Sequence, residues 1–334
     1  MTINKKIKEI FKGYYNNYLT KKHYSSAQNL KEKDYENYLA DRYAEFMNRR
    51  EYTKGKTLNL ENPTTFSEKS QWIKLYDQDP RKNIYSDKYA VRQHIKDTIG
   101  REHLIPLINI DGKDCFDSFD EIDFDKLPNS FVIKCVHGSH MNIIVKDKTK
   151  LTKKDIKQFK KKIKHWQNID YCFYVALETQ YLGIKPRIII EEYVDDINKD
   201  YKFMCFNGKC EYFWISENVV DNKNVTYTTF NRDLSIADFN MNLGWRKNIL
   251  DKNLPKNINE MILIADKLSE DFCFVRVDLY EIKGKIYFGE LTFNSAAGFD
   301  VPYPAEYDVK LGNLMTIDLS KRENNFKYRK NENN

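Results

Sequence analysis

The stretch that decides the fold begins as Phe274-Val-Arg-Val-Asp-Leu-Tyr280 and continues, after Lys283-Gly284, as Ile286-Tyr-Phe-Gly-Glu-Leu-Thr-Phe293. Both parts are rich in branched and aromatic side chains, which is typical of β-strands. The glycine between them favours a tight connection. We therefore expect a closing antiparallel hairpin in which both strands are largely buried.

Charged side chains interrupt the apolar faces of this hairpin. Because alternate residues of a strand point to the same side, Arg276 shares a face with Asp278, and Glu290 shares one with Thr292. A buried carboxylate is costly unless a cation accompanies it. Two interpretations are open. Either Arg276 pairs with Asp278 or Glu290 in a buried ion network, or Asp278 and Glu290 hold Mg²⁺, a hard ion that takes carboxylate oxygens.

The loop between the two strands decides whether the carboxylates converge. Asp278 and Glu290 point the same way only if that loop has an odd number of residues. A three-residue loop containing Gly284 meets the condition, because glycine accepts the left-handed conformation such a loop needs. The metal site therefore requires such a loop, because a two-residue Lys283-Gly284 turn is expected to put the carboxylates on opposite faces and remove the site.

Apolar periodicity places further strands and single helices along the chain. Strands are expected at Phe131–Val136, Met141–Val145, Arg187–Val194, Tyr201–Phe206 and Glu211–Ile215. Helices are expected at Ser67–Tyr76, Lys88–Thr98, Lys153–Lys164 and from Ile258 onward, with polar helices in residues 1 to about 60. Asn207-Gly208 predicts a two-residue hairpin turn. This mixture predicts an α+β fold rather than a regularly alternating parallel sheet.

Composition sets the outer bounds. The 334 residues suit two or three packed lobes, and 41% hydrophobic residues supply a core. Charged residues make up 31% and are mixed in sign, which excludes wholesale disorder. The sequence shows no apolar run of membrane-spanning length and no signal-peptide pattern, so we expect a cytoplasmic protein. The six scattered cysteines form no C-x-x-C pair, which favours buried reduced thiols over zinc or disulfides.

The most basic stretch, Lys153 to Lys164, contains seven lysines. Ile156 and Ile163 recur through it at helical spacing, which indicates an amphipathic helix with a solvated lysine face. Thr152 and Asp155 have the spacing of a capping box. No aromatic residue lies among the lysines on the polar face, so a nucleic-acid surface is disfavoured.

Two more segments carry candidate chemistry. Lys134 interrupts an apolar strand, and its ammonium either snorkels to the sheet edge or reaches a phosphate in a cleft. The turn His137-Gly-Ser-His140 follows directly, and backbone N–H groups with a hydroxyl and imidazoles can wrap anionic oxygens. Further on, Ile188–Val194 is an apolar strand that becomes acidic at Glu191-Glu192; taken alone, it is best interpreted as a strand emerging into solvent.

In this order along the chain, the features resemble the plan of the ATP-grasp fold. More closely, the sequence is similar to the TupA-like ATP-grasp family, which is associated with bacterial surface polysaccharides. The similarity covers roughly residues 45 to 315. The matching motifs are Leu58–Lys69 with Gln71-Trp72, Ser86–Arg92, Leu127-Pro128 followed by Phe131–Ser139, Asp200–Lys209, Val275–Tyr280, Gly289–Phe293 and Glu306–Asp308.

The resemblance implies two α+β lobes that grip ATP, preceded by a helical N-terminal region. On this basis we expect a helical region at residues 1–100 and a lobe with the phosphate loop at residues 101–195. A lobe with the metal-binding hairpin is expected at residues 196–334.

The resemblance also implies a set of nucleotide contacts. Lys88 and Lys134 would face the phosphates, and a mobile loop of His137, Gly138 and Ser139, with His140, would close over them. A hinge of Glu191, Glu192, Tyr193 and Val194 would hold adenine. Asp200 and Lys202 would reach ribose or phosphate.

For catalysis, the resemblance implies that Asp278 and Glu290 bind Mg²⁺, with Thr292 where many relatives have a ligand asparagine. Arg276, assisted by Lys134, would stabilise the negative charge that develops during reaction. Two positions depart from the family pattern. His140 stands where a second glycine is usual, and Asn294-Ser-Ala-Ala-Gly298 replaces more common aromatic and proline residues.

The implied activity is ATP-dependent ligation of an amino acid or small amine to a uronic-acid carboxylate. It would serve the synthesis of a capsule, O-antigen or similar glycan, with ATP and Mg²⁺ as cofactors and peripheral contact with membrane-bound glycan machinery. One rival is glycosyl transfer, for which Asp123-Phe-Asp125 offers a D-x-D triplet, although a surface turn is the favoured interpretation of it. The other rival is a non-catalytic nucleotide-binding assembly protein.

Overall fold

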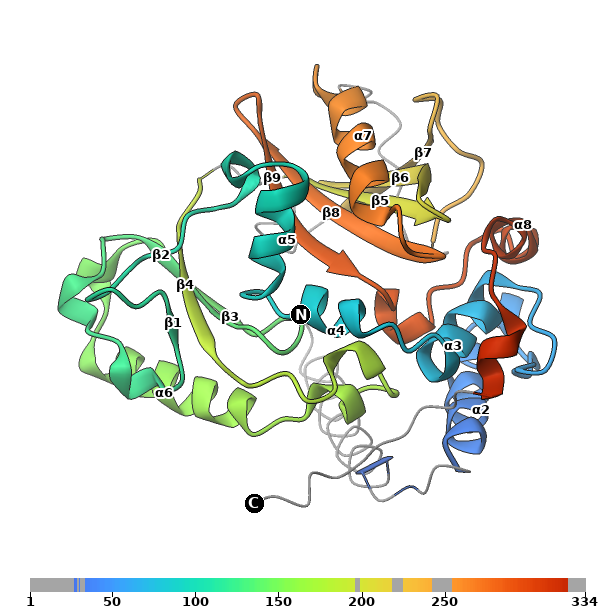
Figure 1. Ribbon diagram of the computed structural model, residues 1–334, viewed down its shortest axis with the longest axis horizontal. Helices are drawn as coiled ribbons and strands as arrows, with labels where there is room; N and C mark the ends of the chain where they lie inside the picture. The colour runs from blue at the N-terminus through green and yellow to red at the C-terminus, as the bar shows by residue number, and fades with distance from the viewer. Residues whose placement is uncertain are drawn as a thin grey trace, which may run out of the picture.

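The chain folds around two antiparallel sheets in a computed structural model, which describes residues 27–28, 30, 34–195, 199–217, 225–241 and 254–323. One sheet has four strands in the order β1-β4-β2-β3, and the other has five in the order β7-β6-β5-β8-β9. Helices α4 and α5 lie between the two sheets (Figure 1). The strands are β1 Cys115–Phe116, β2 Phe131–Cys135, β3 Asn142–Val145, β4 Ile188–Glu192, β5 Lys199–Phe206, β6 Lys209–Glu217, β7 Thr226–Asn231, β8 Phe274–Ile282 and β9 Lys285–Thr292.

Each sheet is backed by one amphipathic helix. Helix α6, Lys153–Gln167, covers the four-stranded sheet through Ile163 and begins with the predicted capping box of Thr152 and Asp155. Helix α7, Ile258–Ser269, packs on the five-stranded sheet (Figure 1). Single helices combined with antiparallel hairpins confirm the predicted α+β class.

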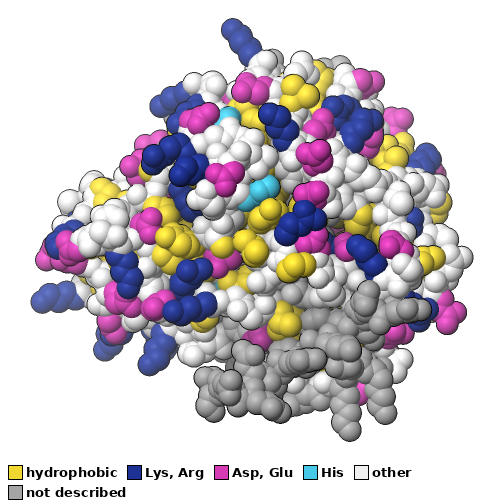
Figure 2. Space-filling model, in the orientation of Figure 1, with side chains coloured by type: hydrophobic (Ala, Val, Ile, Leu, Met, Phe, Trp, Pro, Cys, Tyr) yellow, Lys and Arg dark blue, Asp and Glu magenta, His cyan; other side chains and the backbone are white. Residues whose placement is uncertain are grey.

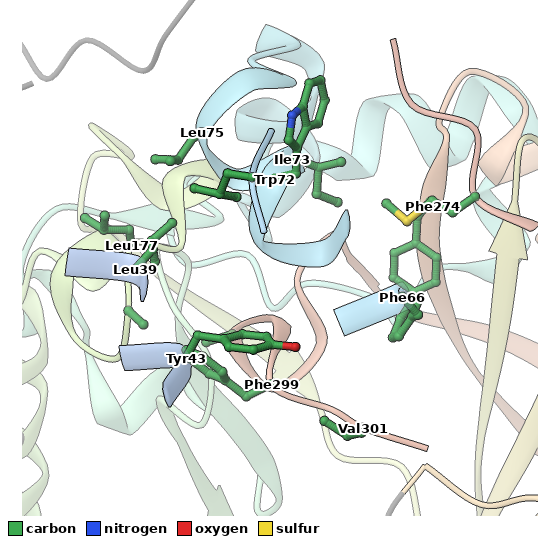
Figure 3. Packing of buried hydrophobic residues seen from close by; sticks show 14 of the residues in the cluster. Leu39, Tyr43, Phe66, Trp72, Ile73, Leu75, Leu177, Phe274, Phe299 and Val301 are labelled. Atoms are coloured by element: carbon green, nitrogen blue, oxygen red, sulfur yellow. The ribbon is translucent and has the colours of Figure 1, made fainter. Parts of the chain in front are cut away.

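A third core joins the N-terminal helices to the end of the chain. Helices α2 (Tyr35–Met47), α3 (Phe66–Tyr76) and α8 (Glu306–Leu314) surround it. Figure 3 shows Trp72 and Phe66 of α3 packing with residues from distant parts of the chain, including Leu177, Phe274 and Phe299. This core ties α3 to the segments that flank the candidate site.

Two predicted helices need comment. The helix expected at Ser67–Tyr76 is confirmed, with Thr65 and Glu68 forming its capping box. The helix expected at Lys88–Thr98 is wrong at its beginning, because α4 (Pro80–Ser86) ends first and α5 starts only at Val91. Lys88 therefore lies in the connection between two helices. Of the polar helices expected in the first 60 residues, those in residues 1–26, 29 and 31–33 lie outside the described residues.

Other expectations concern the surface and the thiols. Among the described residues, no helix combines the length and apolar character that crossing a bilayer needs. All six cysteines are free, and four of them are buried, as expected. Asp123 accepts a hydrogen bond from the backbone N–H of Asp125 in an exposed 3₁₀ turn, which confirms the surface-turn interpretation of the D-x-D triplet. Basic and acidic side chains are interspersed over the face in Figure 2.

Candidate active site

A pocket between the two sheets gathers charged residues from several parts of the chain. Its walls come from β2 and the turn after it, from β4, from the segment around α4 and α5, and from β5, β8 and β9. Seven of the predicted site residues line it: Lys88, Lys134, Ser139, Glu191, Lys202, Asp278 and Glu290. It is also lined by residues that the sequence analysis did not select, among them Tyr85, Arg92, Tyr181, Tyr280 and Phe288.

On the four-stranded sheet, Lys134 and Glu191 meet on one face. Lys134 of β2 pairs with Ile189 of β4, which puts Glu191 diagonally beside it on the same side of the sheet. The Lys134 ammonium is 2.5 Å from a Glu191 oxygen, and a quarter of the lysine side chain is exposed to the pocket. Arg92 approaches the same carboxylate at 3.6 Å. Burial lowers the pKa of Arg92 despite this carboxylate.

Lys88 connects this wall to the opposite one. Its backbone N–H donates to the carbonyl of Val136, and its ammonium donates to the carbonyl of Gly138 at 2.7 Å. The same ammonium is 3.9 Å from Glu290 on β9. Burial lowers the pKa of Lys88, although the Glu290 carboxylate opposes the shift. A cation held by a carbonyl and a distant carboxylate can still take an anionic ligand.

Only the second half of the predicted phosphate loop, Ser139 with His140, lines the pocket. His137 is buried, with its Nε2 3.0 Å from the carbonyl of Trp166 on α6, so its ring lies away from the pocket. Gly138 faces Tyr171, and a Cβ added there would come within 2.5 Å of that ring. His140 has φ of 58°, the left-handed conformation that the usual glycine would adopt without strain.

The hairpin of β8 and β9 departs from its predicted connection. Ile282 pairs with Lys285, so the loop is the two-residue turn Lys283-Gly284, with φ of 54° and 84°. The three-residue loop that convergence was expected to require is therefore absent from this hairpin. Even so, Asp278 pairs directly with Glu290, because the register shifts between Asp278 and Leu279.

A β-bulge at Gly289 causes this shift. Leu279 pairs with Phe288 and Asp278 pairs with Glu290, which leaves Gly289 as the extra residue on β9. A Cβ at Gly289 would lie 2.9 Å from the carbonyl oxygen of Asp278 and 3.1 Å from the Tyr280 ring. Glycine is thus required for the close approach that brings the two carboxylates to one face.

Asp278 is the centre of an ion network. Arg276 grips its carboxylate with Nε at 2.6 Å and Nη2 at 2.7 Å, and the Lys202 ammonium lies at 2.8 Å. Only 3% of the Asp278 side chain is exposed. Burial alone would raise the pKa of Asp278, but Arg276 and Lys202 outweigh it, and the pKa lies below its ordinary value. The buried ion network is therefore present.

Lys202 and Asp200 extend the network along β5. The Lys202 ammonium also binds Asp200, so it bridges two carboxylates. Burial lowers the pKa of Lys202, but Asp278 and Asp200 outweigh it and the net shift is upward. Burial raises the pKa of Asp200, whose Oδ1 has no hydrogen-bond partner among the described residues. Asp200 does not itself line the pocket.

The donor set on this hairpin fits Mg²⁺ bound together with phosphates. Glu290 is one-third exposed and makes only long contacts with cations, at 3.5 Å to Arg276 and 3.9 Å to Lys88. The Thr292 hydroxyl donates to Glu290 at 3.2 Å and accepts from Arg276 at 3.1 Å. Within the described residues, no group of three or more His, Cys, Asp or Glu side chains is placed to hold a metal ion. Magnesium usually takes one or two protein carboxylates and completes its ligands with phosphate and water, and Asp278 and Glu290 would be those carboxylates.

The expected adenine hinge lies where the chain leaves the four-stranded sheet for the five-stranded one. Strand β4 ends at Glu192, whose backbone N–H donates to the carbonyl of Pro106. Tyr193 and Val194 are half-buried and follow β4 directly, and β5 begins at Lys199. Of this segment only Glu191 lines the pocket. Arg276 and Thr292 lie outside the pocket lining as well, but both contact Glu290, which lines the pocket, at 3.5 and 3.2 Å.

Sequence reasoning missed several lining residues for identifiable reasons. Arg92 ends the matching motif Ser86–Arg92 and lies in the first turn of α5, but nothing in that motif relates it to Glu191, more than ninety positions away. Tyr181 belongs to a short 3₁₀ turn, Thr179–Tyr181, that has no periodic signal. Tyr280 lies two residues after Asp278, so the two-residue period of a strand is the sequence signal that points to it.

Comparison with known proteins gives one broad match. The sequence profile of the TupA-like ATP-grasp family matches residues 68–316, which is most of the chain. No curated protein matches the sequence. The family match confirms the ATP-grasp fold that the resemblance implied.

Solved structures are similar at a distance. D-alanine–D-alanine ligase from Bacillus anthracis, complexed with ATP, is 13% identical with a TM-score of 0.39, over 77% of this chain and 66% of that one. The D-alanine–D-alanine ligase from Helicobacter pylori is 15% identical with a TM-score of 0.36, over 70% and 62%. The macrocyclase MdnC from Microcystis aeruginosa MRC, bound with precursor peptide MdnA, is 10% identical with a TM-score of 0.37, over 71% and 63%. The chain thus spans less than two thirds of the length of these enzymes, and such distant likeness carries no activity over to it.

Proposed function

The chain belongs to the TupA-like ATP-grasp family, and we propose that it is an ADP-forming ligase that activates a carboxylate with ATP and passes the acyl group to an amine. One observation carries this proposal. Cations from both walls, Lys88, Lys134 and Lys202, converge on the pocket into which the paired carboxylates Asp278 and Glu290 also face. A site that offers ammonium groups for phosphate beside carboxylates for a metal suits a metal-bound nucleotide.

The nucleotide would lie between the two sheets. Lys88 and Lys134 would bind its phosphates, and Ser139, next to Gly138 and His137, would cover them. Phosphate would then replace Glu191 as the partner of Lys134 and the Gly138 carbonyl as the partner of Lys88.

Adenine would sit at the hinge Glu191–Val194, where Glu192, Tyr193 and the Val194 backbone lie. Asp200 and Lys202 would reach ribose or phosphate. The orphaned Oδ1 of Asp200 supports this role, since a buried acceptor without a partner gains a hydrogen bond from a hydroxyl ligand.

Asp278, Glu290 and Thr292 are proposed to hold Mg²⁺. When bound there, the ion would neutralise phosphate charge and orient the terminal phosphate for transfer to the carboxylate. Arg276 keeps Asp278 ionised and in place, because its two parallel hydrogen bonds favour the charged form of that carboxylate.

Arg276 is proposed as the residue that stabilises negative charge on the reacting acyl group, with Lys134 on the phosphate side. A free carboxylate is a poor acyl donor because its charge repels nucleophiles and oxide cannot leave. Transfer of a phosphoryl group supplies the leaving group, and preorganised cations stabilise the charge that develops when the amine attacks.

We propose a uronic acid as the carboxylate donor and an amino acid or small amine as the acceptor, in the synthesis of a bacterial surface polysaccharide. The proposed organisation keeps a helical region at 1–100 and two lobes at 101–195 and 196–334. We also propose a cytoplasmic location, with peripheral contact to membrane-bound glycan machinery and no role in nucleic-acid binding.

A coupled ADP-release screen tests the proposed function. Uronic acids are combined with amino acids and amino alcohols in the presence of Mg-ATP, and hydroxylamine replaces the amine in a parallel set. ADP release that requires both a carboxylate and an amine, together with a trapped hydroxamate, would support the ligase. Consumption of UDP-sugars with no ADP release from any pair would overturn it in favour of glycosyl transfer.

A further inference from the structure

Almost all of the N–H donors of Arg276 have hydrogen-bond partners. A guanidinium has five N–H donors in a fixed plane. Nε and one N–H of Nη2 bind Asp278, and the other Nη2 N–H is directed at Thr292 at 3.1 Å. One N–H of Nη1 binds the Ser295 hydroxyl at 2.6 Å. Among the described residues this leaves a single donor of Arg276, the second N–H of Nη1, without a partner.

Ser295 binds one N–H of Nη1, which fixes the plane of the guanidinium and therefore the direction of the remaining Nη1 N–H. A serine hydroxyl has one proton and two lone pairs. The Ser295 proton is directed at Asp300, with Oγ 2.6 Å from Oδ2 of that carboxylate. Because the proton is used there, the lone pairs are left for the Arg276 guanidinium. Asp300 therefore orients the hydroxyl, and the hydroxyl orients Nη1.

The turn that carries Ser295 is itself held in a strained conformation. Ala296 and Ala297 have φ of 46° and 54°, a left-handed region that residues with a Cβ seldom adopt. Two buried side chains of α3 hold the turn. Gln71 donates to the carbonyl of Gly298 and Lys74 to that of Ala297, both at 2.7 Å. Backbone strain that is held by buried partners occurs preferentially at functional sites.

We propose that Ser295 and Asp300 are positioning residues that set the direction of the one uncommitted N–H of Arg276, and so aim it at the carboxylate that becomes activated. This inference rests on the proposed function and adds to it two residues outside the pocket lining. Neither is proposed to touch ATP, since neither lines the pocket.

Ser295→Ala is the direct test, with Ser269→Ala as a matched control. Ser269 is also a buried serine whose hydroxyl donates one hydrogen bond, to the carbonyl of Asp266, but it lies on α7. Small errors in the placement of a catalytic group cost up to about 100-fold in rate. We expect Ser295→Ala to lower kcat about 30-fold with KM for ATP changed less than about twofold, and Ser269→Ala to leave kcat unchanged.

Two further variants separate positioning from a structural role. Ser295→Thr keeps the hydroxyl and should restore kcat to within about threefold of the wild type, and Asp300→Asn should resemble Ser295→Ala. In an Arg276→Lys background, Ser295→Ala should cost less than about twofold more, because the serine acts through the arginine. Equal loss in Ser295→Ala and Ser269→Ala, or a full additional loss in the Arg276→Lys background, would overturn the proposal.

A measurement without turnover distinguishes failure of this proposal from failure of the ligase assignment. Nitrogen-15 NMR of arginine side chains reports rotation about the Cζ–N bonds, and the signal missing from Arg276→Lys identifies Arg276. Rotation should be faster in Ser295→Ala than in wild type and unchanged in Ser269→Ala. If no substrate pair releases ADP, the ligase assignment fails, but the rotation rates still test whether Ser295 positions Arg276. Equal rotation rates in wild type and Ser295→Ala would overturn the positioning role whatever the activity.

Discussion

The two walls of the pocket hold their charges in different ways. On the four-stranded sheet, Lys134 contacts one carboxylate, Glu191, and a quarter of the lysine side chain is exposed. On the five-stranded sheet, Asp278 is almost fully buried and accepts hydrogen bonds from both Arg276 and Lys202. The first wall presents a cation that can exchange its partner, and the second presents a carboxylate fixed by two cations.

This difference separates nucleotide binding from stability. Lys134 is a quarter exposed but Glu191 is buried, so phosphate can replace Glu191 beside Lys134 because Arg92, 3.6 Å away, stays as a cation for that carboxylate. Removing one partner of a buried network is expensive, because it leaves the other charges without compensation. Removing the buried Asp278 should therefore affect both folding and turnover, whereas removing the partly exposed Lys134 should act chiefly through the nucleotide phosphates.

The largest effect is expected on the metal-binding hairpin. Asp278→Asn and Glu290→Gln should each lower ADP release about 1,000-fold or more, because each removes a negative oxygen from the proposed Mg²⁺ ligands. They should differ in stability. Asp278→Asn should cost about 3 kcal/mol in urea unfolding, since Arg276 and Lys202 lose their buried carboxylate. Glu290→Gln, at a one-third exposed position, should cost under about 1 kcal/mol.

Full turnover in either variant would reject the metal site. Equal stability losses in the two variants would contradict the contrast between a fixed and an available carboxylate.

Arg276→Lys should have the next largest effect. Lysine keeps the positive charge but loses the planar fork that grips Asp278 at 2.6 and 2.7 Å. We expect kcat to fall about 100-fold with little change in KM for ATP, because the arginine is proposed to act on charge that develops during reaction. Steady-state kinetics checks this, and an unchanged kcat would leave Arg276 as part of an ion network only.

Gly289→Ala should break the register on which the second wall depends. The added Cβ would lie 2.9 Å from the Asp278 carbonyl, so the strands must shift, and we expect a stability loss of about 1–3 kcal/mol with about 30-fold lower turnover. Gly284→Ala in the same hairpin is the control. Gly284 has φ of 84° but open space around its Cα, so its replacement should cost stability without affecting turnover. Equal turnover losses at both glycines would mean that the bulge does not position the carboxylates.

The smallest effect is expected on the lysine wall. Lys134→Ala should weaken ATP binding about tenfold, which is the value of one charge-assisted contact, and leave adenosine binding unchanged. The buried Glu191 keeps Arg92 at 3.6 Å, so the stability loss should be about 1 kcal/mol, smaller than that of Asp278→Asn. Isothermal titration with both ligands measures this, and equal losses for ATP and adenosine would make Lys134 structural.

Structural features that depend on local sequence pattern could be predicted here, and those that depend on tertiary contacts could not. The strands of the closing hairpin follow from their alternating apolar residues, and the α6 capping box follows from Thr152 and Asp155. The bulge at Gly289 could not be predicted in this way. A two-residue turn combined with a one-residue bulge pairs Asp278 with Glu290 just as a three-residue loop would, so the pattern of the two strands does not distinguish them. Convergence of Asp278 and Glu290 was thus predicted with the wrong turn.

Side-chain direction within the site was less predictable. The sequence places His137 beside Gly138, but only the packing of α6 reveals that the imidazole binds the Trp166 carbonyl instead of facing the pocket. Likewise, only the fold shows that the Ser295 hydroxyl accepts a hydrogen bond from Arg276. Contacts between residues far apart in sequence carry no local signal, so they emerge from the fold.

The most direct test of the central claim follows an oxygen atom. Activation of a carboxylate through an acyl phosphate moves one carboxylate oxygen into the phosphate that is released. A uronic acid labelled with ¹⁸O in its carboxylate, together with Mg-ATP and the amine that supports ADP release, is therefore expected to give labelled inorganic phosphate in step with amide formation, and none with Asp278→Asn. Amide formation with all of the label retained in the sugar or the amide would contradict the acyl-phosphate route, and with it the assignment of this protein as an ADP-forming ligase.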